Sequence, residues 1–237
     1  MDLPDLPRTE AAIVELTNEF RRQNSLPALK QNGALAAAAQ AFATYLARTA
    51  KFAHEADGRK PTERARASGY HFCIVAENLA LNQRSAGFRT RDLATEAVEG
   101  WKNSPPHRAA MLQPHVVDIG VGIARGPERD PKFISVQLFG RPESLKYRFE
   151  IENRSGATVG YRFGENQLTI PAATRVTHTA CTPSKVSFEI PSASSAYDPK
   201  DGMQFLLQRD TSGAPSLVIS EKPAAAGQAR GDVNRKQ

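Results

Sequence analysis

Three polar side chains in the first half of the chain have the types that a metal site or a proton-transfer site needs: His54, Glu77 and His107. Neutral imidazole nitrogen and carboxylate oxygen are both ligands that zinc accepts. The alternative is purely structural: His54 holds a loop, Glu77 accepts backbone amides and His107 lies at the surface. Spacing alone favours this structural interpretation.

The residues before His107 predict a short helix that runs to Met111. Ser104 is a residue type that caps helices at the N-terminus, and Pro105 suits the first helical position. His107 then lies in the first turn, where the positive end of the helix disfavours an imidazolium. We therefore expect a neutral His107, the form that binds a metal or accepts a proton.

Common enzyme and nucleotide-binding motifs are absent from the sequence. It contains no Gly-x-Ser-x-Gly nucleophile elbow and no Walker loop, and the run from His54 to Gly58 lacks the second histidine of a helical zinc motif. Residues 120–126 hold three glycines, but the third is displaced from the dinucleotide-binding pattern and the segment is typical of a strand. We therefore expect no nucleotide fold.

Helical periodicity and strand-like runs alternate over the first 142 residues, which predicts helices packed on an antiparallel sheet. Apolar residues recur with helical spacing over 13–20, 33–50 and 92–103, and a short helix is expected over 62–68. Strands are expected over 74–81, 119–123 and 133–139. The third helix must end before Ser104, because two prolines follow it.

A second domain is predicted over residues 144–220. Short alternating runs are separated there by turn residues at nearly regular spacing, which is typical of a small all-β sandwich or barrel. Residues 221–237 contain few apolar side chains, and we expect them to form a disordered tail.

Composition excludes several classes of protein. No run approaches the roughly 18 apolar residues of a membrane helix, so no transmembrane segment is expected. The net charge is +6, but basic residues do not cluster on one predicted element, so no nucleic-acid partner is expected. Two cysteines exclude a four-cysteine metal site and leave a Cys73–Cys181 bridge as an open alternative. The N-terminus has no leader pattern, so the protein is cytoplasmic or its leader has been removed.

Four segments, in this order, resemble the bacterial SCP-like branch of the CAP superfamily, which includes cysteine-rich secretory, antigen 5 and pathogenesis-related proteins. The resemblance covers about residues 8–142. The segments are Glu77-Asn-Leu-Ala80, Ala97-Val-Glu-Gly-Trp-Lys-Asn-Ser-Pro-Pro-His-Arg-Ala-Ala-Met-Leu112, Asp118-Ile-Gly-Val-Gly122 and Val136-Gln-Leu-Phe-Gly140.

The resemblance implies an α+β fold, a three-layer α-β-α sandwich with an open cleft. In several members that cleft holds a divalent metal between two histidines and acidic residues. It implies His54, Glu77 and His107 as ligands, with zinc the expected ion, and it places Asn78 beside them. Ser104 stands where animal and plant members usually carry a second acid, so the resemblance implies a three-ligand site or none. Glu96 or Glu99 would substitute only if its helix face points to the cleft.

The function implied is that of a secreted or periplasmic binding protein, which is non-catalytic and uses the cleft to hold a divalent ion and a ligand or protein partner. The enzyme alternative is a metal-assisted hydrolase with Glu77 as the base. A third alternative, also implied by relatives, is lipid or sterol carriage in an apolar groove.

Overall fold

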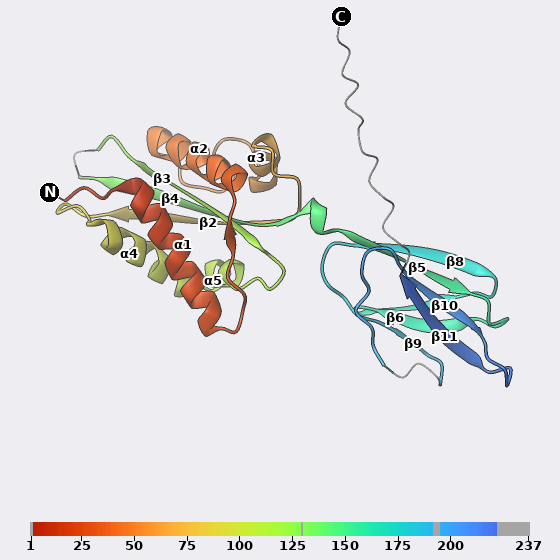
Figure 1. Ribbon diagram of the computed structural model, residues 1–237. Helices are drawn as coiled ribbons and strands as arrows, with labels where there is room; N and C mark the ends of the chain where they lie inside the picture. Colours follow the sequence, from red (N-terminus) through yellow and green to blue (C-terminus); the bar gives the residue numbers. More distant parts are fainter. Residues whose placement is uncertain (1, 129, 192–194, 222–237) are drawn as a thin grey trace, which may run out of the picture. The chain divides into compact units, whose positions relative to one another are not determined.

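A computed structural model describes residues 2–128, 130–191 and 195–221 (Figure 1). The chain divides into two compact units between Leu145 and Lys146, and each is described by itself. No helix among the described residues is long and apolar enough to cross a membrane. Both cysteines, Cys73 and Cys181, are disulfide-bonded.

The N-terminal unit contains a four-stranded sheet in the order β1-β3-β4-β2, in which β1 is parallel to β3 and the other pairs are antiparallel. The four expected helices and the short helix after Ser104 are present, whereas β1 was not expected. The elements are α1 (Leu6–Gln23), β1 (Lys30–Gln31), α2 (Gly33–Thr49), α3 (Pro61–Ala67), β2 (Phe72–Gln83), α4 (Thr90–Lys102), α5 (Pro105–Met111), β3 (Asp118–Arg125), β4 (Lys132–Pro142) and the 3-10 turn η1 (Glu143–Leu145).

Helices cover both faces of this sheet, as Figure 1 shows: α2 and α3 lie on one face, and α1, α4 and α5 lie on the other. Each face has its own apolar cluster. Leu35, Phe42 and Leu46 of α2 belong to one cluster, and Ile13 and Trp101 belong to the cluster on the opposite face. The three-layer α-β-α sandwich is therefore confirmed.

Two glycines of β3 let α2 pack directly on the strand. A Cβ at Gly120 would overlap the backbone at Ala36, and a Cβ at Gly122 would overlap the backbone at Gln40. Their role is close helix packing, which explains the glycine-rich run without a nucleotide.

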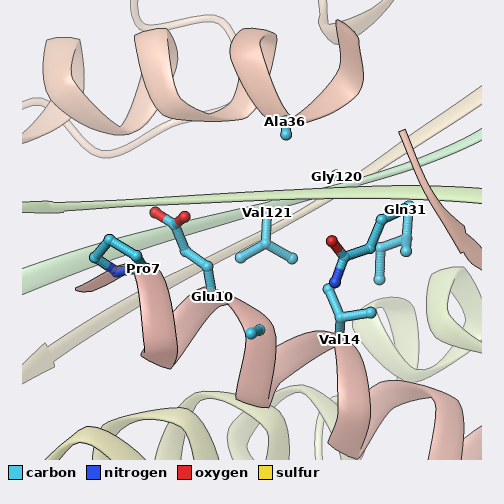
Figure 2. A pocket seen from close by; sticks show the side chains of 9 residues that line it. Pro7, Glu10, Val14, Gln31, Ala36, Gly120 and Val121 are labelled. Carbon is cyan, nitrogen blue, oxygen red and sulfur yellow. The ribbon is translucent and has the colours of Figure 1, made fainter. Parts of the chain in front are cut away.

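Past the end of β1, side chains from α1 and α2 form hydrogen bonds with the outer edge of β3. The Ile123 amide donates to Glu10 Oε1 (3.0 Å) and Gln40 Oε1 (3.1 Å), while Gln40 Nε2 donates to the Ile123 carbonyl (3.1 Å). A pocket of about 130 Å³ lies beside this contact, lined by Pro7, Glu10 and Val121 among others (Figure 2). Burial raises the pKa of Glu10 there.

The C-terminal unit consists of a four-stranded sheet in the order β11-β10-β5-β8 and a three-stranded sheet in the order β7-β6-β9. Its core residues come from both sheets, which makes it a sandwich. The strand β8 lacks the alternating apolar residues on which the prediction of this unit rests. The strand β11 extends to Glu221, and the rest of the expected disordered tail lies outside the described residues. The strands are β5 (Tyr147–Asn153), β6 (Val159–Phe163), β7 (Asn166–Ile170), β8 (Thr174–Ala180), β9 (Val186–Phe188), β10 (Met203–Arg209) and β11 (Pro215–Glu221).

Candidate functional site

His54 and Glu77 are brought together at the edge strand β2. His54 lies in the turn between α2 and α3, and its Nδ1 is 2.9 Å from Glu77 Oε1. The His54 side chain is 52% exposed, whereas that of Glu77 is 1% exposed. The hydrogen bond to Glu77 raises the pKa of His54 above its ordinary value. The buried carboxylate therefore holds an imidazole that reaches solvent.

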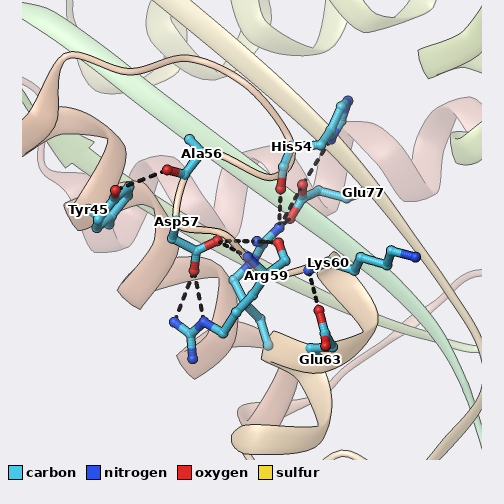
Figure 3. A network of polar contacts seen from close by, with 9 residues as sticks. Tyr45, His54, Ala56, Asp57, Arg59, Lys60, Glu63 and Glu77 are labelled. Atoms are coloured by element: carbon cyan, nitrogen blue, oxygen red, sulfur yellow. Dashed lines mark hydrogen bonds and ion pairs between the residues drawn. The ribbon is translucent and has the colours of Figure 1, made fainter.

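The sequence interpretation missed Arg64, a buried residue of α3 that shares this carboxylate. Its Nη2 donates to both oxygens of Glu77, at 2.8 and 3.0 Å, and its Nη1 donates to Asp57 Oδ1 at 2.9 Å. Its guanidinium also lies over the Phe42 ring, 3.5 Å from the centroid. Figure 3 shows the surrounding network, in which His54 and Glu77 lie close together and Asp57 also contacts Arg59.

This hydrogen-bond network determines which atoms of Glu77 and His54 remain available to a ligand. Both oxygens of Glu77 accept hydrogen bonds from Arg64, and one also accepts from His54. Because Nδ1 of His54 is engaged with Glu77, its Nε2 is the ring nitrogen left for an external partner. The geometry makes Glu77 a positioning residue for His54.

Ser104 and His107 contact each other at the start of α5. Ser104 is the N-cap residue and proline follows it, as expected, but its Oγ makes no capping hydrogen bond. It pairs with Nδ1 of His107 at 2.8 Å instead. Nδ1 is thus engaged in both histidines.

His107 has a lowered pKa, which agrees with the expected neutral imidazole. The cause differs from the expected one. Burial is the largest contribution, and the nearby positive charge of His54 adds to it.

Asn78 joins α5 to the sheet. It is fully buried, and its Nδ2 donates to the His107 carbonyl (3.1 Å) and to Gln137 Oε1 (3.2 Å). It therefore fixes the backbone that carries His107.

The two acids considered as substitutes do not complete a metal site. Glu99 pairs with Lys102 at 2.7 Å, and Glu96 pairs with Arg84 at 2.6 Å. Glu96 does line a pocket of about 250 Å³ that also includes Ser104 and His107. Within the described ranges, no three His, Cys, Asp or Glu side chains form a group arranged to hold a metal ion. Nε2 of His54 and Nε2 of His107 make no hydrogen bond within the described part of the chain, in which Nδ1 is the ring nitrogen engaged.

Comparison with known proteins places this site in one family. Residues 14–139, more than half of the chain, match the model of the CAP family, described as the cysteine-rich secretory protein family. The protein YkwD of Bacillus subtilis (strain 168) is 29% identical over 114 residues, which are 48% of this chain and 41% of YkwD. The match therefore spans well under two thirds of that relative.

Two solved structures are each similar to 57% of the chain. An outer surface protein from Borrelia burgdorferi has 22% identity and a TM-score of 0.49, covering 57% of this chain and 93% of its own. An extracellular protein containing an SCP domain from Bacillus anthracis has 23% identity and a TM-score of 0.47, covering 57% of this chain and 41% of its own.

Proposed function

Because the chain belongs to the cysteine-rich secretory protein (CAP) family, we propose that it is a non-catalytic binding protein. In this proposal, Nε2 of His54 and Nε2 of His107 together hold one divalent cation, zinc foremost, along with a ligand or partner. The single observation that carries the proposal is the pairing of both Nδ1 atoms, one with Glu77 and one with Ser104. A histidine that ligates a metal usually donates its other ring N–H to such a partner.

The donor set fits zinc, because neutral imidazole is one of its common ligands. This reassigns Glu77, expected as a ligand, to the residues that position His54. A bound zinc ion would attract a lone-pair donor of the ligand or partner. Since only two protein ligands are proposed for a metal that prefers four, binding is expected to be weaker than at a four-ligand site, and the partner or water supplies the rest.

The surroundings of Glu77 disfavour the hydrolase alternative. A general base must reach the proton that it accepts, directly or through one water. The Glu77 side chain is 1% exposed, and Arg64 donates to both of its oxygens. Glu77 is therefore poorly placed to activate water.

Calorimetric titration of zinc into the full chain tests the proposal. We expect one zinc per chain in the wild type, and at least a tenfold loss of affinity in His54→Ala and in His107→Ala. Ser104→Ala should cost about 10- to 100-fold, as removal of the partner of a ligand typically does. The exposed His71→Ala is the matched control and should bind as the wild type does. Equal affinity in all five proteins would contradict the proposal.

We also propose that the mature protein is secreted or periplasmic. The disulfide-bonded state of Cys73 and Cys181 supports this, because such bonds persist in oxidising compartments. Fractionation of the native host should find the protein outside the cytoplasm, and recovery in the cytosol would contradict this.

A further inference from the structure

The edge strand β2 directs unsatisfied backbone groups away from the sheet. Its position at the end of the order β1-β3-β4-β2 leaves one side without a neighbouring strand. The Leu79 carbonyl faces that side, because it accepts a hydrogen bond from Trp101 Nε1 (2.9 Å). Alternation along an antiparallel pair directs the N–H and C=O of Leu81 and Gln83 the same way. Among the described residues, nothing hydrogen-bonds the outward groups of Leu81.

The two edges of the sheet differ in how far other parts of the chain hydrogen-bond their outward backbone groups. At the β3 edge, the Gln40 side chain takes both the amide and the carbonyl of Ile123, as a neighbouring strand would. Proteins usually protect edges in this way against pairing with another chain. Within the part of the chain that the structure describes, the β2 edge has such protection only at Leu79, whose carbonyl accepts a hydrogen bond from the indole of Trp101. Beyond that point it offers a template for one more strand.

A groove runs beside this open stretch, between the β2 edge and α4. Its volume is about 250 Å³, and its lining includes Ser104 and His107 at the start of α5. The residues that line it are Leu79, Ala80, Leu81, Asn82, Glu96, Ala97, Gly100, Trp101, Ser104 and His107.

Gly100 lines this groove, and no contact within the described part of the chain explains why the residue is a glycine. It lies inside α4, where glycine is the least favourable residue after proline. A Cβ at this position would meet no atom within 4 Å, so no internal packing requires glycine. Glycine is the residue that allows another backbone to approach closely.

Asn82 gives a second, independent indication of an occupant. It lines the groove and is 8% exposed, and its Oδ1 is buried without a partner in the described structure. Its Nδ2 donates to Glu96 Oε1 (3.1 Å), so an amide oxygen without a partner and a carboxylate lie together in the lining of the groove. Both accept hydrogen bonds, and an occupant that donates would satisfy them.

We propose that an extended peptide segment of a partner protein adds to the β2 edge as a fifth strand, between β2 and α4. Its backbone pairs with the outward groups of Leu81 and Gln83 and passes over Gly100. A donor on the peptide reaches Asn82 and Glu96. Strand addition of this kind takes affinity from main-chain hydrogen bonds and specificity from alternate side chains. The inference deepens the proposed function, because His107 lines the groove, but it requires no metal.

Selection of a phage-displayed library of random dodecapeptides on the full chain supplies the probe. Peptides that bind are then titrated against variants in EDTA. Gly100→Leu fills the groove and should weaken binding at least tenfold, whereas Gly33→Ala should not, because this exposed glycine lies at the start of α2, away from the groove. Zinc binding should persist in Gly100→Leu, and peptide binding should persist in His54→Ala. The two proposals can therefore fail separately.

Methylation of the peptide backbone tests the strand itself. Peptides methylated at one backbone nitrogen at a time should lose affinity at every second position, because alternate N–H groups face β2. Uniform loss or no loss along the peptide would overturn the proposal. So would a failure to select any peptide, or selected peptides that bind Gly100→Leu as tightly as the wild type. If triacetylchitotriose binds with the same Gly100 dependence and no peptide does, the groove is a sugar site and the proposal is wrong.

Discussion

His54 and His107 are held in the same manner by unlike partners, a buried carboxylate for His54 and a hydroxyl for His107. The carboxylate is itself held by Arg64, whose guanidinium is 3% exposed. The charge of Glu77 is therefore compensated within the protein, and the histidines are oriented before any ligand arrives.

Replacing Arg64 should destabilise the N-terminal unit strongly. Arg64→Met leaves the buried carboxylate of Glu77 without its cation, and breaking a buried pair in this way typically costs about 3–5 kcal/mol of unfolding free energy. Urea unfolding followed by Trp101 fluorescence measures the loss. Arg66→Met, an exposed neighbour on α3, is the control and should cost far less. The double variant Arg64→Met, Glu77→Leu should recover much of the stability, and equal losses for Arg64→Met and Arg66→Met would contradict the account.

His178 should make the C-terminal unit sensitive to acid. Its Nε2 is 3.0 Å from the Tyr161 hydroxyl, its ring stacks on Phe149, and burial lowers its pKa. The folded state thus prefers the neutral ring, so stability is lost as the pH falls below the unfolded value of about 6.5. Thermal unfolding followed by circular dichroism at pH 8 and pH 5.5 measures this loss. His178→Gln should flatten the pH dependence, and an unchanged dependence would exclude His178 as its source.

At the scale of the element, two glycines of the N-terminal unit should respond oppositely to alanine. Gly100→Ala adds a methyl group in open space within α4 and should raise the unfolding free energy by about 0.5–1 kcal/mol. Gly122→Ala should lower it, because the Cβ would overlap the backbone of α2 at Gln40. Urea unfolding of both variants gives the two values. A loss of stability in Gly100→Ala would show that the glycine serves folding rather than an occupant.

Sequence patterns predicted the helices and strands whose own residues show a periodicity. They missed two strands that are defined by pairing with another strand. The helices follow apolar periodicity, and α4 ends before two prolines, as expected. β1 is two polar residues long and exists only through hydrogen bonds to β3. Val176 is the only large apolar residue of β8, so the strand shows no alternation of apolar and polar residues that could have predicted it. Both strands escaped prediction because partners distant in the chain define them.

The candidate site, too, could be predicted only in part from the sequence. The types of His54 and His107, together with the family motifs, identified both histidines as candidates. Arg64 lies on a short helix with a second arginine, and nothing in the sequence separates the buried one from the exposed one. Its role follows from the position of β2 under α3, which brings Glu77 to it. Buried ion pairs of this kind need the tertiary structure to be seen.

At the scale of the whole molecule, we expect Cys73 and Cys181 to be bonded to each other. Such a bridge closes a loop of about 108 residues, for which chain entropy gives about 4–5 kcal/mol of stabilisation. Thiol titration under denaturing conditions should find no reactive thiol before reduction and two after it. A mass equal to that of one chain excludes pairing between chains. Two reactive thiols in the oxidised protein would contradict the bridge.

The central proposal is that Nε2 of His54 and Nε2 of His107 bind one divalent cation. Crystals of the full chain soaked in zinc, with anomalous scattering recorded at the zinc edge, test it most directly. The account predicts one anomalous peak about 2.0–2.1 Å from both Nε2 atoms, with Glu77 and Ser104 still on the Nδ1 side of each ring. The absence of a peak within reach of both imidazoles, or a zinc ion bound to Glu77 in place of Arg64, would contradict it.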